Sequence, residues 1–426
     1  MVRAGIVEID RALHQTHAEK ASVEIQRGLG LGGDGGEVVK TQKAHLVQFL
    51  TKGRVSGQHE GVREGGLRYP DTVHPSRMLE EIRQQPATLE RTLRSSSRPA
   101  AQLARALAGR KPKMVVLVAR GTSDNAAQFG RYLIEITTGI PCTLAAPSVT
   151  TLYGARVDWR DALVVAISQS GESTDTNLVL ERAGEAGAVT AGITNETSST
   201  LAKLAQHVFP VRAGRERSVA ATKTYTGQIL LLYVVARVLG AWIDEEHLES
   251  LPEWVEAALR MEPEIRARAE RYRFMERAAV VARGLNYANA FEFSLKLMET
   301  CYLVAQRFSS ADFLHGPIAM VEPAFPLFLF APPGVTWPAT RAMLAKLDRL
   351  GAETLAITDA SNEEATSRSR AIVLPRAVSR KRADPADLLS PIPYIVPAQV
   401  FAASLAEWKG LDPDRPRTLT KVTRTL

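Results

Sequence analysis

Apolar and polar residues follow two rhythms along this chain, and both predict regular secondary structure. From Met78, apolar residues recur at helical spacing through Leu79, Ile82, Leu89 and Leu93, which predicts a helix. From residue 114, short apolar runs alternate with helical segments. The expected strands cover 114–119, 141–146, 162–167, 189–194 and 207–211. One expected helix follows the polar turn at 120–125 and ends near 136, and three more cover 175–186, 200–205 and 220–239. This alternation predicts an α/β fold with a parallel, doubly wound sheet.

The same pattern returns in the second half of the chain. Residues 118–126 are echoed by 281–290, 192–195 by 356–359, and 208–210 by 373–375, each about 164 residues further on. Three echoes at nearly one offset predict a duplicated domain. We therefore expect a first domain over 78–245 and a second over 246–426, joined by a charged helical region at 244–273 that packs against them.

Residues 1–77 differ from the rest of the chain. They are mixed in charge, weakly periodic and Gly-rich, with a cluster from Gly28 to Gly36. A segment of this kind cannot bury a core, so we expect a weakly structured N-terminal extension. Two interpretations stay open: translation begins at Met78 and the preceding residues are a gene-prediction artefact, or they form a disordered extension.

Composition narrows the class of protein. The chain has 426 residues, with 45% hydrophobic and 23% charged, which is typical of a soluble globular protein. The net charge is +7, but basic and acidic residues are interleaved, so nucleic-acid binding is not expected. The most apolar helical run, 229–239, is too short to span a bilayer, and no signal core opens the chain. The two cysteines, Cys142 and Cys301, lack metal-type spacing and indicate a reduced, cytoplasmic protein. No metal or other cofactor is expected.

The candidate site with the clearest sequence signal, an anion-binding site, follows the apolar run 162–167. The chain there breaks into Ser168-Gln169-Ser170-Gly-Glu-Ser173 and resumes helical spacing at 178–180, which predicts a strand, a tight turn and a helix start. A helix N-terminus carries unpaired N–H groups and the positive end of the helix dipole, so a hydroxyl-rich turn there suits a phosphate monoester. An ordinary N-capped turn needs only one Ser or Thr. The four hydroxyls within seven residues favour an anion site.

Four further clusters are candidates to line this site, because ligands of such sheets bind beyond the carboxyl ends of the strands, between the two halves. The first contains Ser123 after the first strand, and the second contains Val219 and Thr222 at the start of helix 220–239. The third contains Glu292, Lys296 and Glu299 on one helix face together with His315 before a Gly-Pro turn, and the fourth contains Lys421 in the C-terminal tail. A helix cap at Ser123 and a frayed tail are the plain alternatives. The flanks of the charged helix face are so apolar that we expect it to be buried, and a buried charged face needs a reason.

Several motifs together carry a family resemblance: Arg120-Gly-Thr-Ser-Asp, Ser168-Gln-Ser-Gly, Val219-Ala-Ala-Thr-Lys-Thr-Tyr, Phe313-Leu-His-Gly-Pro and Leu419-Thr-Lys-Val-Thr-Arg-Thr-Leu. From about Met78 to the C-terminus the chain resembles tandem sugar isomerase (SIS) proteins with flavodoxin-like domains. It is similar to the isomerase half of glucosamine-6-phosphate synthases and closer to stand-alone hexosamine-phosphate deaminases.

The resemblance implies roles for individual residues. Those implied to hold the sugar phosphate are Ser123, Ser168, Gln169, Ser170 and Ser173, with Val219 at the same pocket. Glu299 matches the base of the family, Lys296 its supporting lysine, His315 its ring-opening histidine and Lys421 its Schiff-base lysine. The family commonly places the His-Gly-Pro segment in the site of a neighbouring subunit, so the resemblance also implies a homodimer.

The implied chemistry is consistent with these residue types. Interconversion of an amino aldose and a ketose needs ring opening and then a proton transfer between C2 and C1. A partly desolvated carboxylate such as Glu299 can take and return that proton, and His315 can move protons at the ring oxygen. Lys421 either forms an imine with the keto sugar or stabilises developing negative charge.

Two departures from the family pattern matter: the first removes or replaces one phosphate or sugar contact, and the second shifts the expected reaction. Ala221 stands where the synthases typically have Ser, and residue 2 is Val, where a glutaminase half would need its Cys nucleophile. We therefore expect hydrolytic deamination of glucosamine 6-phosphate to fructose 6-phosphate and ammonia. Deamination of galactosamine 6-phosphate, a fructosamine 6-phosphate deglycase, and a sugar-phosphate-sensing regulator remain as alternatives.

Overall fold

The computed structural model describes residues 75–368, 370–375 and 386–421. All but the last three residues of the extension predicted at 1–77 therefore lie outside the described part of the chain. Within that part, no helix is both long enough and apolar enough to cross a membrane.

The first half builds a five-stranded parallel sheet in the order β2-β1-β3-β4-β5. Its strands are β1 (Met114–Val118), β2 (Cys142–Leu144), β3 (Ala162–Ser168), β4 (Val189–Thr194) and β5 (His207–Pro210). The sheet lies among α3 (Arg77–Arg83), α4 (Gln85–Leu107), α5 (Thr122–Thr138), α6 (Pro147–Thr151), α7 (Thr174–Glu185), α8 (Thr200–Leu204) and α9 (Lys223–Val238). Every residue of β3 is buried, as expected for a central parallel strand covered on both faces.

The second half repeats the arrangement with the order β10-β9-β8-β6-β7, all parallel. Its strands are β6 (Arg277–Ala282), β7 (Val304–Ser309), β8 (Pro326–Phe330), β9 (Glu353–Asp359) and β10 (Ala371–Leu374). Its helices are α10 (Glu245–Leu259), α11 (Glu262–Glu270), α12 (Tyr287–Cys301), α13 (Ser310–Leu314), α14 (Trp337–Arg349), α15 (Glu363–Thr366), α16 (Ala386–Leu389) and α17 (Pro391–Trp408), with short 3-10 helices η1 (Gly284–Asn286) and η2 (Pro317–Met320). Because β6 and β8 take the places of β1 and β3, the two sheets have the same topology, which confirms the predicted duplication.

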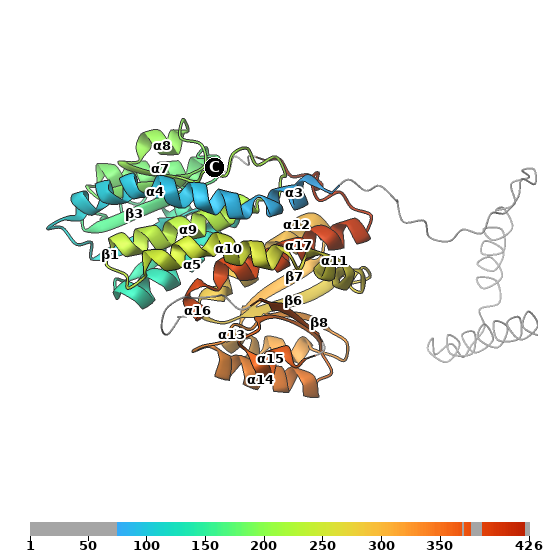
Figure 1. Cartoon of the computed structure of the whole chain (residues 1–426). Coiled ribbons are helices and arrows are strands. Elements are labelled where there is room, and N and C mark those ends of the chain that lie inside the picture. The colour runs from blue at the N-terminus through green and yellow to red at the C-terminus, as the bar shows by residue number, and fades with distance from the viewer. Residues whose placement is uncertain (1–74, 369, 376–385, 422–426) are drawn as a thin grey trace, which may run out of the picture. The chain divides into compact units, whose positions relative to one another are not determined.

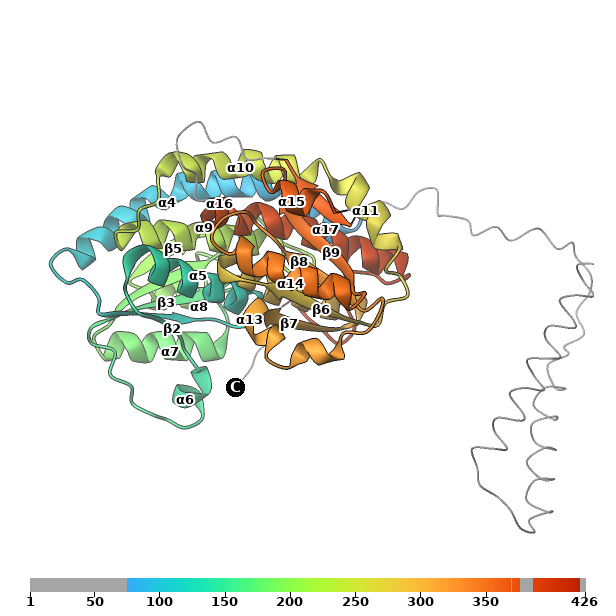
Figure 2. The same cartoon turned by 90° about the horizontal axis from the view of Figure 1, so that it is seen from below.

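Helices between the two sheets form a shared central layer. In Figure 1, α4, α9, α10 and α17 lie between the sheets, whereas α7 and α8 cover the outer side of the first sheet and α14 the outer side of the second. Figure 2 shows the second sheet from that outer side, with α14 in front of it. The largest apolar cluster fills the central layer with side chains from both halves, and each outer layer has a smaller cluster of its own. Burial of this continuous apolar surface holds the halves together.

Helix α9 begins at Lys223, three residues later than its pattern predicts. The reason lies outside the helix, in Glu216. Its carboxylate accepts hydrogen bonds from the backbone N–H groups of Thr222 and Thr224, at 2.9 and 3.2 Å. It thus satisfies donors that a helix N-terminus leaves unpaired, and residues 220–222 stay non-helical.

Candidate active site

A pocket of about 340 Å³ opens at the carboxyl end of the first sheet. It lies where β1 and β3 diverge into α5 and α7, the point at which the strand order reverses and where sheets of this kind bind ligands. Its lining residues are Arg120, Gly121, Thr122, Ser123, Ile167, Ser168, Gln169, Ser170, Ser173, Val219, Ala221, Thr224, Glu299, Leu419, Thr420 and Lys421. Loops of the first half thus meet one residue of α12 and the C-terminal tail in a single pocket.

The turn after β3 presents its hydroxyls in an ordered arrangement. The Ser168 hydroxyl accepts a hydrogen bond from the Gly171 N–H at 3.1 Å, and the Ser170 hydroxyl accepts one from the Glu172 N–H at 3.3 Å. Ser173 precedes the first residue of α7 in an extended conformation. The turn therefore places hydroxyls at a helix N-terminus that faces the pocket, which is a favourable environment for an anion.

Glycine is required at one position of this turn. Gly171 has a φ of +67°, and a Cβ added to it would lie 2.1 Å from Ser199 Oγ and 2.4 Å from Ser199 Cβ. A side chain there would meet both a strained backbone and a collision. The close approach of Ser199 keeps the turn tight.

The opposite wall comes from the end of β1 and the start of α5. Ser123 Oγ accepts a hydrogen bond from Gln228 Nε2 of α9 at 3.0 Å, which fixes its hydroxyl. Arg120 forms an ion pair with Asp175 at 2.6 Å between Nη2 and Oδ2. Asp175 lies in the first turn of α7, so Arg120 offsets a carboxylate near the expected phosphate position.

The charged face of α12 is buried, as its apolar flanks predicted. Glu292 and Lys296 have no exposed surface, and Lys296 Nζ lies 3.4 Å from Glu292 Oε1 and 2.6 Å from Glu299 Oε2. The Thr122 hydroxyl accepts from Lys296 at 3.1 Å and donates to Glu292 at 3.2 Å, and Asn125 donates to Glu292 at 2.7 Å. This network holds Glu299 against the pocket from behind.

Burial and charge set the protonation of this network. Burial raises the pKa of Glu292 to about 7, although Lys296 and Asn125 lower it. Burial alone would lower the pKa of Lys296, but Glu292 and Glu299 together raise it above its ordinary value. Lys296 is therefore a fixed cation that anchors the Glu299 carboxylate, and Glu299 lines the pocket together with Thr122.

The tail contributes Lys421. Its Nζ lies 3.2 Å from Glu216 Oε2 and donates a hydrogen bond to the Ser218 carbonyl oxygen at 2.6 Å. Arg417, four residues earlier, stacks on Tyr302 with its guanidinium 4.5 Å from the ring centre. Asp414 accepts the backbone N–H groups of Arg77 and Met78, each at 2.8 Å, so the described part of the tail is docked at three points.

Three residues proposed from the sequence lie elsewhere among the described residues. Lys296 stands behind Glu299 rather than in the lining. Thr222 is fully buried outside the lining, and Thr224 lines the pocket instead. Because α9 begins only at Lys223, Thr222 lies outside the helix, and its side chain does not have the position that a helix start near residue 220 predicted. His315 follows α13, is exposed, and is not part of this pocket.

The arrangement combines three chemical functions in one space. The Ser168 turn offers hydroxyl groups and a helix N-terminus to a phosphate, Glu299 offers a carboxylate for proton transfer, and Lys421 offers an ammonium or amine. Sequence reasoning did not single out Glu216, which holds Lys421. Its only local signal is an acid between two arginines, which resembles an ordinary solvated loop.

Comparison with known proteins gives the same picture. The model of the family described as SIS domain matches residues 110–237 and 274–406. An isomerizing glutamine–fructose-6-phosphate aminotransferase of Pyrococcus horikoshii is 31% identical over 390 residues, which cover 90% of this chain and 61% of that protein. The chain spans 51% to 64% of the length of such curated relatives.

Solved structures share the fold. The C-terminal domain of glucosamine-fructose-6-phosphate aminotransferase from Francisella tularensis matches with a TM-score of 0.71 and 28% identity, over 80% of this chain and 99% of that one. A glucosamine-6-phosphate deaminase from Thermotoga maritima matches with a TM-score of 0.62 and 20% identity, over 82% and 100%, which shows the fold alone. With both halves matched by the family model and both sheets sharing one topology, this chain belongs to the SIS domain family.

Proposed function

We propose that this protein is an isomerising deaminase that converts glucosamine 6-phosphate and water to fructose 6-phosphate and ammonia. The observation that carries the proposal is that a hydroxyl-rich turn at a helix N-terminus and the Glu299 carboxylate, from different halves of the chain, line one pocket. The first suits a phosphate monoester and the second suits proton transfer at the far end of a short sugar chain.

The proposed steps follow from these positions. After ring opening, Glu299 removes the C2 proton of the amino aldose and returns it to C1, which converts an enolamine into an imine at C2. Water adds to C2 and ammonia leaves, giving the C2 ketone of fructose 6-phosphate. Lys421 and, behind Glu299, Lys296 provide positive charge that stabilises the negative charge developing on the oxygen at C1.

Neither of the two cysteines of this chain is in a state to release ammonia from glutamine. Release of ammonia from glutamine by a cysteine requires an accessible thiolate. Cys142 and Cys301 are both buried, and burial raises the pKa of each thiol to about 12. One protein with this fold, from Thermotoga maritima, carries the name glucosamine-6-phosphate deaminase.

The test is ammonia release by the full chain from glucosamine 6-phosphate and from galactosamine 6-phosphate, with unphosphorylated glucosamine as the control. We expect equimolar ammonia and fructose 6-phosphate from the gluco substrate and none from the control. Faster release of ammonia from galactosamine 6-phosphate would show that this epimer, and not glucosamine 6-phosphate, is the preferred substrate. Release from neither would overturn the proposal, and a parallel assay with fructosamine 6-phosphate would then test the deglycase alternative.

We further propose that the protein works as a homodimer in which His315 completes the pocket of the neighbouring subunit. His315 is exposed on its own chain and lies outside that chain's pocket, yet ring opening needs an acid–base group. Mixing full-length Glu299→Gln and His315→Asn chains tests this. Half of the randomly formed dimers then contain one chain of each kind, and in these dimers one pocket combines an intact Glu299 with an intact His315 from the other chain. We expect recovery of about a quarter of the activity. No recovery from two inactive parents would contradict the shared site.

A further inference from the structure

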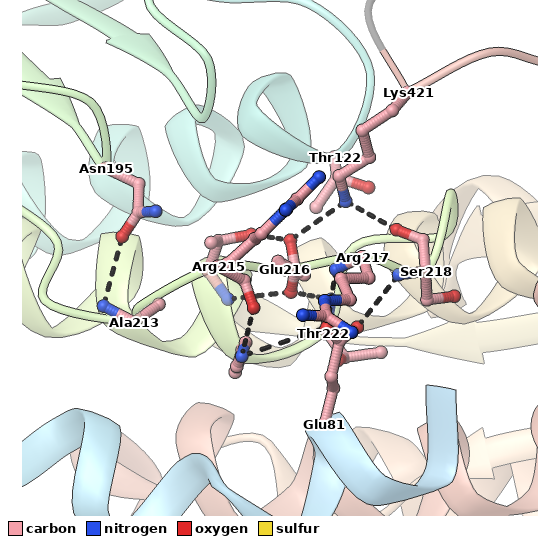
Figure 3. Close-up of polar contacts among 12 residues, drawn as sticks. Glu81, Thr122, Asn195, Ala213, Arg215, Glu216, Arg217, Ser218, Thr222 and Lys421 are labelled. Carbon is pink, nitrogen blue, oxygen red and sulfur yellow. Dashed lines mark hydrogen bonds and ion pairs between the residues drawn. The ribbon is translucent and has the colours of Figure 1, made fainter. Parts of the chain in front are cut away.

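The loop between β5 and α9 contains a fully buried carboxylate beneath the tail lysine. Glu216 is 4% exposed as a residue, and its side chain has no exposed surface. Figure 3 shows Lys421 reaching this loop from the tail, with dashed contacts to Glu216 and Ser218. Both partners of the Lys421 ammonium therefore belong to one short segment.

Glu216 is held in place by several donors. Besides the backbone N–H groups of Thr222 and Thr224, its Oε2 accepts the Thr224 hydroxyl at 2.7 Å. Burial would raise the pKa of Glu216, but Lys421 and these donors bring it below the ordinary value. The carboxylate is thus a rigid, ionised acceptor whose position does not depend on the tail.

A second buried acid approaches the same loop from the other side. In Figure 3, Glu81 rises from α3 opposite Lys421. It accepts the backbone N–H groups of Arg217 and Ser218 at 2.5 and 3.1 Å and pairs with Lys223 at 3.8 Å. Glu81 thus fixes the backbone N–H of Ser218, the residue whose carbonyl oxygen accepts from Lys421.

Each of the two buried acids pairs with a lysine: Glu81 with Lys223 of α9, and Glu216 with Lys421 of the tail. Lys223 belongs to α9 and cannot leave, whereas Lys421 lies near the end of the chain. If the tail undocks, Glu216 loses its nearest cation inside the protein, and an unpaired buried charge is unfavourable. Docking of the tail and pairing of Glu216 are consequently coupled.

We propose that Glu216 is a positioning residue that seats Lys421 in the pocket and so couples tail docking to turnover. Glu216 does not line the pocket and acts through Lys421. The link to turnover rests on the proposed function, whereas the docking itself does not. The Glu216 carboxylate contacts Lys421 and the start of α9 but not the turn after β3. Its replacement by an amide should therefore leave that turn intact and displace the ammonium group.

The first test measures docking without turnover. Hydrogen–deuterium exchange of peptides covering 411–421 is compared between the wild-type chain, Glu216→Gln and Glu353→Gln. Glu353 is a matched control, because it is a buried carboxylate paired with Arg271 and Arg370 at the start of β9. We expect faster exchange of the tail in Glu216→Gln alone. Unchanged protection in Glu216→Gln, or equal loss in Glu353→Gln, would overturn the positioning role.

The second test is a double-mutant cycle on turnover with Glu216→Gln and Lys421→Met. A misplaced catalytic group costs about 100-fold in rate, so we expect Glu216→Gln to lower kcat by about 10- to 100-fold with KM changed less than about twofold. In the Lys421→Met background the same substitution should lower kcat less than about twofold, because the group through which it acts is gone.

Equal losses of kcat in both backgrounds would show that Glu216 is merely structural. If the wild-type chain turns over no amino-sugar phosphate, the proposed function fails, and the exchange experiment still decides the docking claim.

Discussion

The carboxyl ends of the two sheets occupy equivalent places in a duplicated fold, yet they differ in what fills them. In the first half, the turn after β3 leaves a pocket lined by hydroxyls. In the second half, the loop after β8 leads to α14, and the carboxylate of Asp387 fills the corresponding place. The Thr336 hydroxyl donates to Asp387 Oδ2 at 3.4 Å, and the Thr336 backbone N–H also bonds to this carboxylate.

The second half therefore satisfies the start of its helix with a carboxylate of its own chain, where the first half leaves the equivalent place open. Gly334 in that loop approaches Asp387 closely, since a Cβ added to the glycine would lie 3.1 Å from Asp387 Cβ. The shared topology thus gives both halves a helix N-terminus at the carboxyl end of the sheet, where an anion is favourable. The residues around each helix start decide whether that anion is a side chain of the protein or an external ligand.

The largest expected effect is the loss of turnover when Glu299, the proposed proton-transfer group, is replaced, compared with the replacement of a carboxylate outside the pocket. Glu299→Gln removes the acid–base group, so kcat should fall by about 10³-fold or more while fructose 6-phosphate still binds. Glu364→Gln, an exposed carboxylate of α15 in an ion pair with Arg341, is the control and should change neither. Steady-state kinetics with calorimetric binding checks this. Turnover by Glu299→Gln within tenfold of wild type would refute the assignment of the base.

A matched pair of glycines tests the comparison itself. Gly171→Ala should raise KM by about 10- to 100-fold, because the strained turn would lose the hydrogen bonds that we propose it makes to the phosphate. Gly334, with a φ of +108°, is also strained by a side chain, so Gly334→Ala should lower stability by about 1–2 kcal/mol and leave KM unchanged. Kinetics and thermal unfolding of both variants provide the measurement. A similar rise in KM for Gly334→Ala would mean that the second loop also contributes to binding.

A smaller effect on stability is expected from Asp387, whose carboxylate lies at the start of α14 in the second half. Burial raises the pKa of Asp387 from 3.8 to about 6, so the folded state holds this proton more tightly than the unfolded state. The contribution of Asp387 to stability is thus present at low pH and lost as pH rises from about 4 to 6. Asp387→Asn should remove this loss and stabilise the protein at pH 7 by about 1–3 kcal/mol.

Denaturant unfolding of wild type and Asp387→Asn across pH 4 to 7 measures the difference directly. The two curves should converge at the acid end and separate toward neutral pH, with kcat unchanged. Separation that grows toward low pH would contradict the assigned direction of the pKa shift.

Most of the fold could be predicted because its signals are local. The strands of the first half agree with their apolar runs within a few residues, and the echoes in the second half correctly indicated a second sheet. The prediction did not identify α17, in which Pro391, Pro393 and Pro397 obscure a helix whose residues from 391 to 406 are buried. Its prolines at the start and its fully apolar surface leave no amphipathic period to detect.

The site was less accessible from sequence because its contacts are distant. Glu216 and Lys421 are 205 residues apart, and only packing against α3 and the tail buries the acid. The exchange of Thr222 for Thr224 has a different cause, since it depends on where α9 begins. The hydroxyl turn after β3 was identifiable because strand, turn and helix start are contiguous.

The most direct test of the central claim is the number of hexose phosphates bound per chain. Isothermal titration of the full chain with fructose 6-phosphate should give one site, with an affinity weakened by Gly171→Ala and preserved in Gly334→Ala. Two sites per chain, or one site whose affinity Gly171→Ala leaves unchanged, would contradict the proposal that only the first half holds the phosphate.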